Sequence, residues 1–207
     1  KVVAYAYDVV LKQMIPTGID FMAYTYGYGA NMAVADIDGN GKPAIVTAPG
    51  VGGQNPALIK VWTIDTTAKV GSWTVSANPV KQIVLPGTDG ATIAAADIDG
   101  DGRSEIIAGT SGDHAMVTII KADGSQTKFR VSERQSVNLA AADLDGDGLA
   151  EIIAATGPER TEPGSAGDAK SNYGDRQGGR KKDKKEKEAE YGDSDHESGA
   201  VRAFSAS

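Results

Sequence analysis

Short apolar runs alternate with turns rich in glycine and acidic residues along this chain. The first run, Lys1 to Tyr7, alternates valine, alanine and tyrosine, as expected for a strand. Counterparts of this run follow at Ala57–Asp65, Ala115–Asp123 and Ala200–Ser207. The turn Lys121-Ala-Asp-Gly124 leads into a further predicted strand at 127–131. The pattern therefore predicts an all-β chain of short antiparallel strands.

Three of the turns share one acidic pattern, and each lies between two β-branched, alanine-rich runs. The second copy reads Asp97-Ile-Asp99-Gly-Asp101-Gly-Arg103-Ser-Glu105. The third reads Asp143-Leu-Asp145-Gly-Asp147-Gly-Leu149-Ala-Glu151, and the first reads Asp36-Ile-Asp38-Gly-Asn40-Gly-Lys42-Pro-Ala44. Each copy predicts a strand, a compact loop and a second strand.

Carboxylates at positions 1, 3 and 5 of such a loop are expected to converge, because its glycines permit the positive φ angles that fold the chain back. Like charges so close repel each other, so a cation is expected among them. Oxygen ligands suit a hard ion, and calcium is favoured over zinc. The position-7 carbonyl and the position-9 glutamate would complete the shell. The predicted ligands are Asp97, Asp99, Asp101, Arg103 and Glu105, then Asp143, Asp145, Asp147, Leu149 and Glu151, then Asp36, Asp38, Asn40 and Lys42.

The first copy departs from this pattern. Asn40 replaces a carboxylate and Ala44 removes the ninth-position ligand, so a site at Asp36 and Asp38 is expected to be weaker or empty. In all three copies, Asp-Gly and Asn-Gly are also good hairpin turns without any metal. Repetition of the same offsets favours metal binding in the second and third copies. The first copy stays open between the two interpretations.

The spacing Asp-x-Asp-Gly-Asp-Gly-x-x-Glu followed by Ile-Ile resembles the FG-GAP or VCBS repeats of β-propellers, a family that includes the integrin α-subunit head. The resemblance covers the three motifs and most of the chain between them. It implies β-propeller-type blades of four antiparallel strands, with calcium in the hairpin between the first two strands of a blade.

About three and a half repeats are expected, fewer than the four or more blades of an ordinary ring. They comprise a half repeat at 1–30, repeats at 31–90 and 91–137, and a repeat at 138–207 with a charged insertion at 157–199. The propeller is therefore predicted to be incomplete or assembled between chains. The insertion is either a solvated loop or an arm that docks a partner.

The composition of the chain limits which partners and which cellular location are expected. The net charge of -7 argues against nucleic acid as a partner. The sequence contains no run of 18 apolar residues, so no membrane span is predicted. There are no cysteines, and calcium ions could replace disulfides where calcium is millimolar, so an extracellular or cell-surface location is expected. The opening at Lys1 is typical of a processed mature end or of a fragment.

Other residues offer little chemistry. His114 and His196 lack the companions of a catalytic triad, so no enzyme is predicted. The tyrosines at 24, 26 and 28 alternate along a strand-like stretch, where they would bind a sugar or a partner, or pack between blades. Trp62 is expected to pack between blades.

These observations predict a non-enzymatic, calcium-binding extracellular structural or adhesion module. Copies are expected to assemble into a ring or filament, with residues 9–15 of one chain adding a strand to the unfinished C-terminal repeat of another. One alternative is a carbohydrate-binding or lyase-associated propeller domain. Another is a fragment of a larger adhesin.

Overall fold

The computed structural model describes residues 1–25, 27–52, 54–87, 89–112, 114–133 and 136–156, and the backbone of 201–204. This part of the chain contains fourteen strands and no helix, which confirms the all-β class. It therefore holds no helix that is long and apolar enough to cross a membrane. The charged insertion at 157–199, which includes His196, lies outside the described residues, as does Tyr26.

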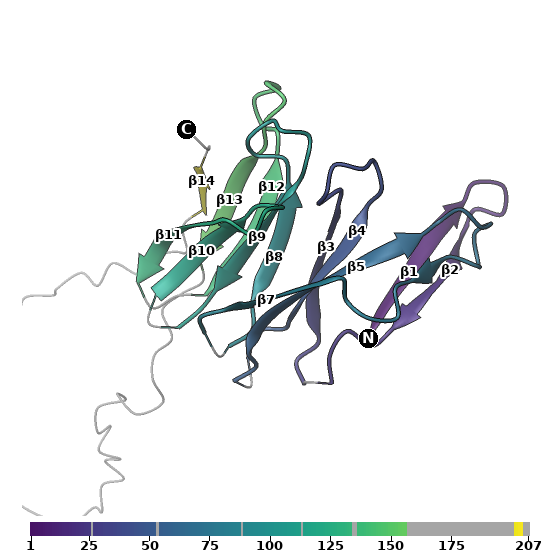
Figure 1. The fold of residues 1–207 in the computed structure, drawn as a ribbon, viewed down its shortest axis with the longest axis horizontal. Helices are drawn as coiled ribbons and strands as arrows, with labels where there is room; N and C mark the ends of the chain where they lie inside the picture. Colours follow the sequence, from purple (N-terminus) through teal and green to yellow (C-terminus); the bar gives the residue numbers. More distant parts are fainter. Residues whose placement is uncertain are drawn as a thin grey trace, which may run out of the picture.

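Four antiparallel sheets follow one another along the chain (Figure 1). The first is the hairpin of β1 (Val2–Asp8) and β2 (Gln13–Phe21). The second has the order β3 (Ala30–Ala35), β4 (Ala44–Pro49), β5 (Ala57–Asp65) and β7 (Lys81–Leu85), and the short β6 (Thr74–Val75) also pairs with β5. The third has the order β8 (Thr92–Ala96), β9 (Glu105–Thr110), β10 (His114–Ile120) and β11 (Gln126–Glu133). The fourth has the order β12 (Val137–Ala142), β13 (Glu151–Thr156) and β14 (Val201–Phe204).

The sheets pack face to face in an open row, and the core lies between them (Figure 1). In β4, the neighbours Ile45 and Val46 belong to different apolar clusters: Ile45 packs toward the first sheet and Val46 toward the third. In β9, Ile106 and Ile107 divide in the same way between the second and fourth sheets. Every residue of β4 and β9 is buried, because these strands are covered on both faces.

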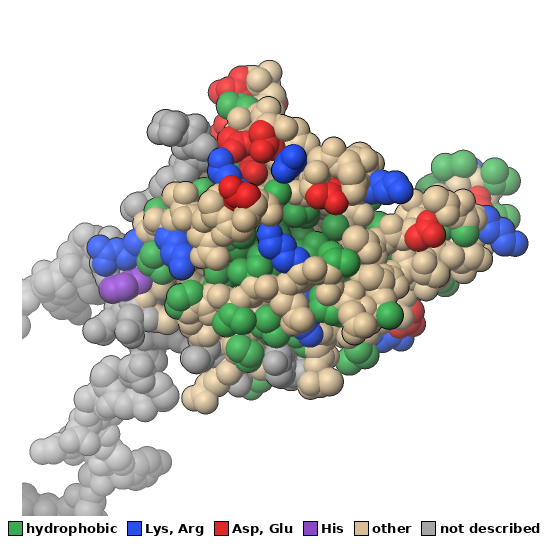
Figure 2. Space-filling view, viewed as in Figure 1, with side chains coloured by type: hydrophobic (Ala, Val, Ile, Leu, Met, Phe, Trp, Pro, Cys, Tyr) green, Lys and Arg blue, Asp and Glu red, His purple; other side chains and the backbone are tan. Residues whose placement is uncertain are grey.

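The first strands of the last three sheets are neighbours, since β8 contacts both β3 and β12. Each of these strands is joined to the second strand of its sheet by one of the three acidic loops. The three loops consequently lie along one rim of the molecule. Figure 2 shows the acidic side chains gathered at this rim, at the top of the view.

Two local expectations are wrong. Residues Val9 to Leu11 form the exposed turn between β1 and β2, so the strand expected at 9–15 begins only at Gln13. The stretch that carries Tyr24 and Tyr28 is not a strand. Tyr24 is buried and its hydroxyl lies 2.8 Å from the backbone carbonyl of Thr47, whereas Tyr28 is exposed.

Trp62 packs between the first and second sheets, as expected for a tryptophan between neighbouring sheets. Its ring lies against Phe21, with 4.8 Å between ring centroids. Its indole Nε1 donates a hydrogen bond to Thr47 Oγ1 at 3.0 Å. The bond satisfies the one polar atom of an otherwise apolar side chain, which allows the ring to be buried.

Candidate metal centre

The glycines of each acidic loop adopt the left-handed backbone conformation that the sequence requires of them. Gly100 and Gly102 have φ angles of 75° and 82°, and Gly146 and Gly148 have angles of 82° and 93°. A side chain at these positions would be strained, because its Cβ disfavours positive φ. The glycines therefore allow the chain to wrap around the first aspartate of the loop.

That first aspartate organises the loop by accepting hydrogen bonds from the backbone. Asp97 Oδ1 accepts from the Gly100 amide at 2.7 Å, and its Oδ2 accepts from the Gly102 amide at 2.9 Å. Asp143 accepts the equivalent bonds from Gly146 and Gly148 at 2.7 and 2.9 Å. Asp36 does the same in the first loop, at 2.9 and 2.7 Å. The three loops thus share one backbone conformation.

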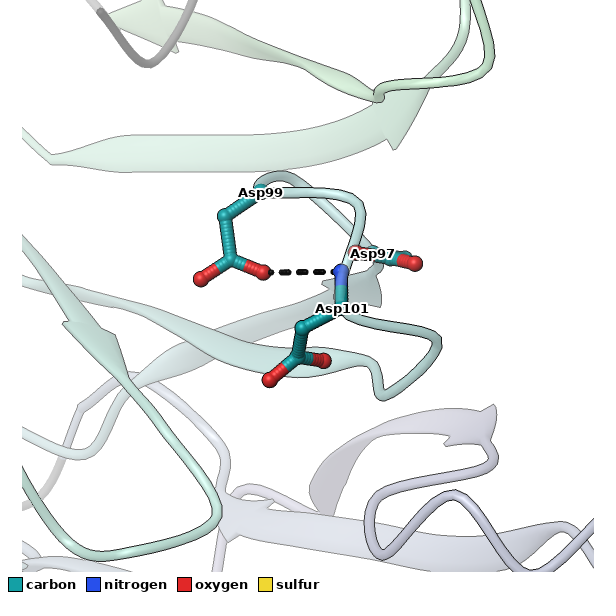
Figure 3. A group of neighbouring side chains, drawn as sticks. All are labelled: Asp97, Asp99 and Asp101. Carbon is teal, nitrogen blue, oxygen red and sulfur yellow. Dashed lines mark hydrogen bonds between the residues drawn. The ribbon is translucent and has the colours of Figure 1, made fainter.

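The aspartates at positions 3 and 5 are held by bonds of the same kind. Asp99 Oδ1 accepts from the Asp101 amide at 3.2 Å (Figure 3), and Asp101 Oδ1 accepts from the Arg103 amide at 2.8 Å. Each of these carboxylates keeps its second oxygen outside these backbone bonds. Asp97, Asp99 and Asp101 bring one carboxylate oxygen each to within 4.8 Å of one another, as a group that could hold a metal ion.

The third loop repeats this arrangement with a different set of three. Its Asp145 and Asp147 accept from the amides two residues ahead of them, at 3.1 and 2.8 Å. Asp143, Asp145 and Glu151 form its metal-competent group. Among the described residues there are therefore two acidic groups that could hold a metal ion, and each combines residues from one predicted loop.

The position-9 glutamates lie at the start of the second strand of each hairpin. Glu105 is only 1% exposed, and its Oε2 accepts a hydrogen bond from the Ile98 amide at 3.0 Å. Glu151 Oε2 accepts the equivalent bond from Leu144 at 2.8 Å. Burial raises the pKa of Glu105, and the nearby aspartates raise it further, although the Ile98 bond opposes them. The ionised form of Glu105 is consequently disfavoured, and a cation close to its carboxylate would stabilise that form.

The first loop offers fewer ligands. Asn40 donates through Nδ2 to Asp38 Oδ2 at 2.8 Å, and its Oδ1 accepts from the Lys42 amide at 2.8 Å. A buried alanine, Ala44, occupies the place of the glutamate. Only two acidic side chains, Asp36 and Asp38, are present in this loop, so its described residues form no group of three. Here the amide of Asn40 supplies a hydrogen bond where the other loops present a carboxylate.

Sequence reasoning missed Lys121, which reaches the second loop from the turn between β10 and β11. Its ammonium Nζ forms an ion pair with Asp99 Oδ2. The hydrogen bond from Lys121 lowers the pKa of Asp99, and the same pairing raises the pKa of Lys121. The turn sequence Lys121-Ala-Asp-Gly124 was recognisable, but nothing in it indicates that the lysine meets an aspartate 22 residues away.

The position-7 residues contact the preceding loop. A Cβ on Gly39 would lie 2.9 Å from Arg103 Cγ, and one on Gly100 would lie 2.8 Å from Leu149 Cδ2. Next to each contact, an amide of one loop donates to the position-1 carbonyl of the loop before it: Ser104 to Asp36 at 2.7 Å, and Ala150 to Asp97 at 2.9 Å. The loops therefore form a continuous row rather than three separate turns.

A scan against protein families finds no matching family, and a search of curated protein sequences finds no match. The resemblance to FG-GAP or VCBS repeats consequently rests on the three motifs of this chain.

Proposed function

We propose that this chain is a non-enzymatic, calcium-binding structural or adhesion module that works outside the cell. We assign its sheets to β-propeller-type blades of the FG-GAP/VCBS kind. The observation that carries the proposal is the pair of acidic groups at Asp97, Asp99 and Asp101, and at Asp143, Asp145 and Glu151. Both occur in loops with the same backbone hydrogen bonds at the same offsets.

Calcium fits these groups better than a transition metal would. All of the side-chain ligands are carboxylates, and hard oxygen ligands favour calcium or magnesium over zinc. Calcium accepts more ligands than magnesium in a less regular geometry, which suits a loop that offers three aspartates, a glutamate and a backbone carbonyl. The aspartates are held in place by backbone amides, so little reorganisation is needed when the ion enters.

Calcium would act as a staple of the fold in this proposal. Extracellular sites of this class have dissociation constants of about 10⁻⁴ to 10⁻³ M. An ion that binds only the folded state at about 20 times its dissociation constant contributes about 2 kcal/mol per site. Since neighbouring loops are hydrogen-bonded to each other, stiffening one loop also supports the next.

A calorimetric titration of the metal-free chain tests the proposal. We expect one calcium ion for each of the two acidic groups, and a calcium-dependent rise in melting temperature. Asp101→Asn and Asp145→Asn should each remove one equivalent while keeping the Oδ1 acceptor that orders the loop. Asp123→Asn is the matched control, because Asp123 also accepts an amide bond but lies in a turn outside both groups. A chain that binds no calcium at millimolar concentration would refute the metal assignment.

Assembly of copies into a ring or filament is the second part of the proposal. Edge pairing by residues 9–15 is disfavoured, since Val9 to Leu11 lie in a turn and β2 is already paired with β1. The other edge of β2 is also partly covered, because the amides of Gly71 and Trp73 donate to the Thr17 carbonyl at 2.9 and 3.0 Å. The faces of the terminal sheets are better placed for assembly than their edges.

A further inference from the structure

The hairpin of β1 and β2 has one face in the core and one apolar face in solvent. Val2 and Ala4 pack toward the second sheet. On the opposite face, Val3 is 38% exposed, and Tyr5, Tyr7 and Met14 are 57 to 58% exposed. The strand register pairs Tyr7 with Met14 and Tyr5 with Pro16, so these four side chains form one patch. Val3 lies at its border and pairs with Asp20, whose carboxylate forms an ion pair with Lys1 at 2.8 Å. We call this patch the head face.

The other end of the row has an exposed face made of alanine side chains and one isoleucine. Ala140 and Ala142 of β12 are exposed, and Ile153 and Ala155 of β13 are half-buried. Ala140 pairs with Ile153 across the two strands, which places these side chains on the side of the fourth sheet that faces away from the third. We call this the tail face.

Three of the four residues of the tail face have an equivalent 46 positions earlier that is buried between sheets, and the equivalent of Ala142, Ala96, is half-buried there. Ala94 and Ile107, the equivalents of Ala140 and Ile153, are buried in the cluster between the third and fourth sheets. Gly109, the equivalent of Ala155, is covered by the fourth sheet, because a Cβ there would lie 2.6 Å from Val137 Cγ1. The tail face thus repeats a surface that the fold buries once already.

The head face corresponds to the opposite side of such a contact, namely the face that a sheet turns toward the sheet before it. In the third-strand position of the second sheet, β5 directs Leu58 and Trp62 toward the preceding hairpin, where they are half-buried and buried. In the corresponding positions, β1 carries Val3 and Tyr7, which are 38% and 58% exposed. Between sheets within the molecule, large side chains such as Val137 meet small residues such as Gly109. In the same way, the head face carries large side chains such as Tyr5 and Tyr7, and the tail face carries mostly alanine.

We propose that copies of this chain stack head to tail, with the head face of one molecule packed on the tail face of the next. The inference rests on the assembly part of the proposed function and is independent of the calcium part. The contact continues the sheet-on-sheet packing already present between the four sheets. Because it joins two different surfaces, it is heterologous and produces either a closed ring or an open filament.

Cysteine cross-linking tests which faces meet, and the chain has no cysteine of its own. Tyr5→Cys marks the head face and Ala155→Cys marks the tail face. An equal mixture of the two full-length variants, treated with a short bismaleimide in calcium buffer, should give cross-linked dimers of one head variant and one tail variant. Dimers of Tyr5→Cys alone would show that heads meet heads and would overturn the proposal. An absence of any dimer at high protein concentration would overturn it as well.

Sedimentation velocity over a concentration series tests the contribution of the patch. Tyr5→Lys should weaken association at least about tenfold, since a charge buried in an apolar contact is costly. Val84→Lys is the control, because Val84 is 72% exposed on β7 and lies outside both faces. Tyr5→Lys and Ala155→Lys mixed together should stop at a dimer, since each variant retains one intact face. A wild-type chain that stays monomeric while it binds calcium would reject stacking and leave the metal proposal intact.

Discussion

The backbone amide of Ser104 donates to the backbone carbonyl of Asp36 at 2.7 Å, and so joins the second acidic loop to the first. Ala150 and Asp97 repeat the bond between the third loop and the second. In both cases the donor occupies position 8 of its loop and the acceptor occupies position 1. The three acidic loops are therefore joined to one another through their backbones.

Gly100→Ala should destabilise the chain more than Gly102→Ala. Both glycines have positive φ, so each alanine costs about 1 to 2 kcal/mol in backbone strain. Only at Gly100 does the new Cβ meet a neighbour, Leu149 Cδ2 at 2.8 Å, whereas nothing lies within 4 Å at Gly102. Urea unfolding of both variants measures the difference. Adding Leu149→Ala to both variants should reduce the difference between their free energies of unfolding. Equal losses of unfolding free energy in the two single variants would argue against contact between the loops.

Lys121→Met should tighten calcium binding in the second loop about two- to fivefold, since an exposed ion pair with Asp99 competes only weakly. The lysine must leave Asp99 Oδ2, or share it, when a cation enters the group. Calorimetric titration at low ionic strength measures the change, which should shrink in added salt. Lys128→Met removes an exposed lysine of β11 and serves as the control. Weaker binding by Lys121→Met would mean that the lysine supports the site.

The buried Glu105 should make the metal-free chain lose stability as pH rises. Its pKa in the folded chain lies above the ordinary value of 4.5, so the folded state holds the proton more tightly than the unfolded state. Stability therefore falls between pH 4.5 and the raised pKa, and the loss persists at higher pH. Melting curves in chelator should show this fall. Glu105→Gln should abolish it and be the more stable chain at pH 7, whereas with calcium present Glu105→Gln should be the less stable.

Ile107→Ala and Ile153→Ala should have unequal effects although they occupy equivalent positions. Ile107 is fully buried between two sheets, so its truncation should cost about 2 to 5 kcal/mol. Ile153 is half-buried on the tail face, and its truncation in a dilute monomer should cost clearly less. Chemical unfolding at low protein concentration compares them. If the two losses were the same, the tail face would already be covered within one molecule.

The strands and loops around Asp36, Asp97 and Asp143 were predictable because the local sequence specifies them. Positive-φ glycines and a first aspartate that accepts nearby amides are properties of a few consecutive residues. The lack of a position-9 carboxylate in the first loop is likewise visible in the sequence, where Ala44 takes its place. These features need no knowledge of how distant parts of the chain meet.

Contacts between distant segments were not predictable in this way. The pairing of Lys121 with Asp99 depends on how one hairpin lies beside another. The burial of Tyr24 depends on polar groups of β4 and β5 that accept its hydroxyl, so the alternation of tyrosines gave a misleading strand signal. Val9 to Leu11 have high strand propensity, but the Asp8 side chain accepts the amides of Val10 and Leu11 at 2.9 Å and stabilises a turn.

Neighbouring isoleucines such as Ile106 and Ile107 contribute to two different apolar clusters, so each inner sheet is half of two interfaces. A single sheet of this chain has no hydrophobic core by itself, because each core cluster is formed between two sheets. Folding must then spread from one sheet to the next, in the manner of a one-dimensional array with nearest-neighbour coupling. A core substitution in an inner sheet therefore destabilises the packing against both neighbouring sheets. Local unfolding is expected to begin at the two terminal sheets, which have one neighbour each.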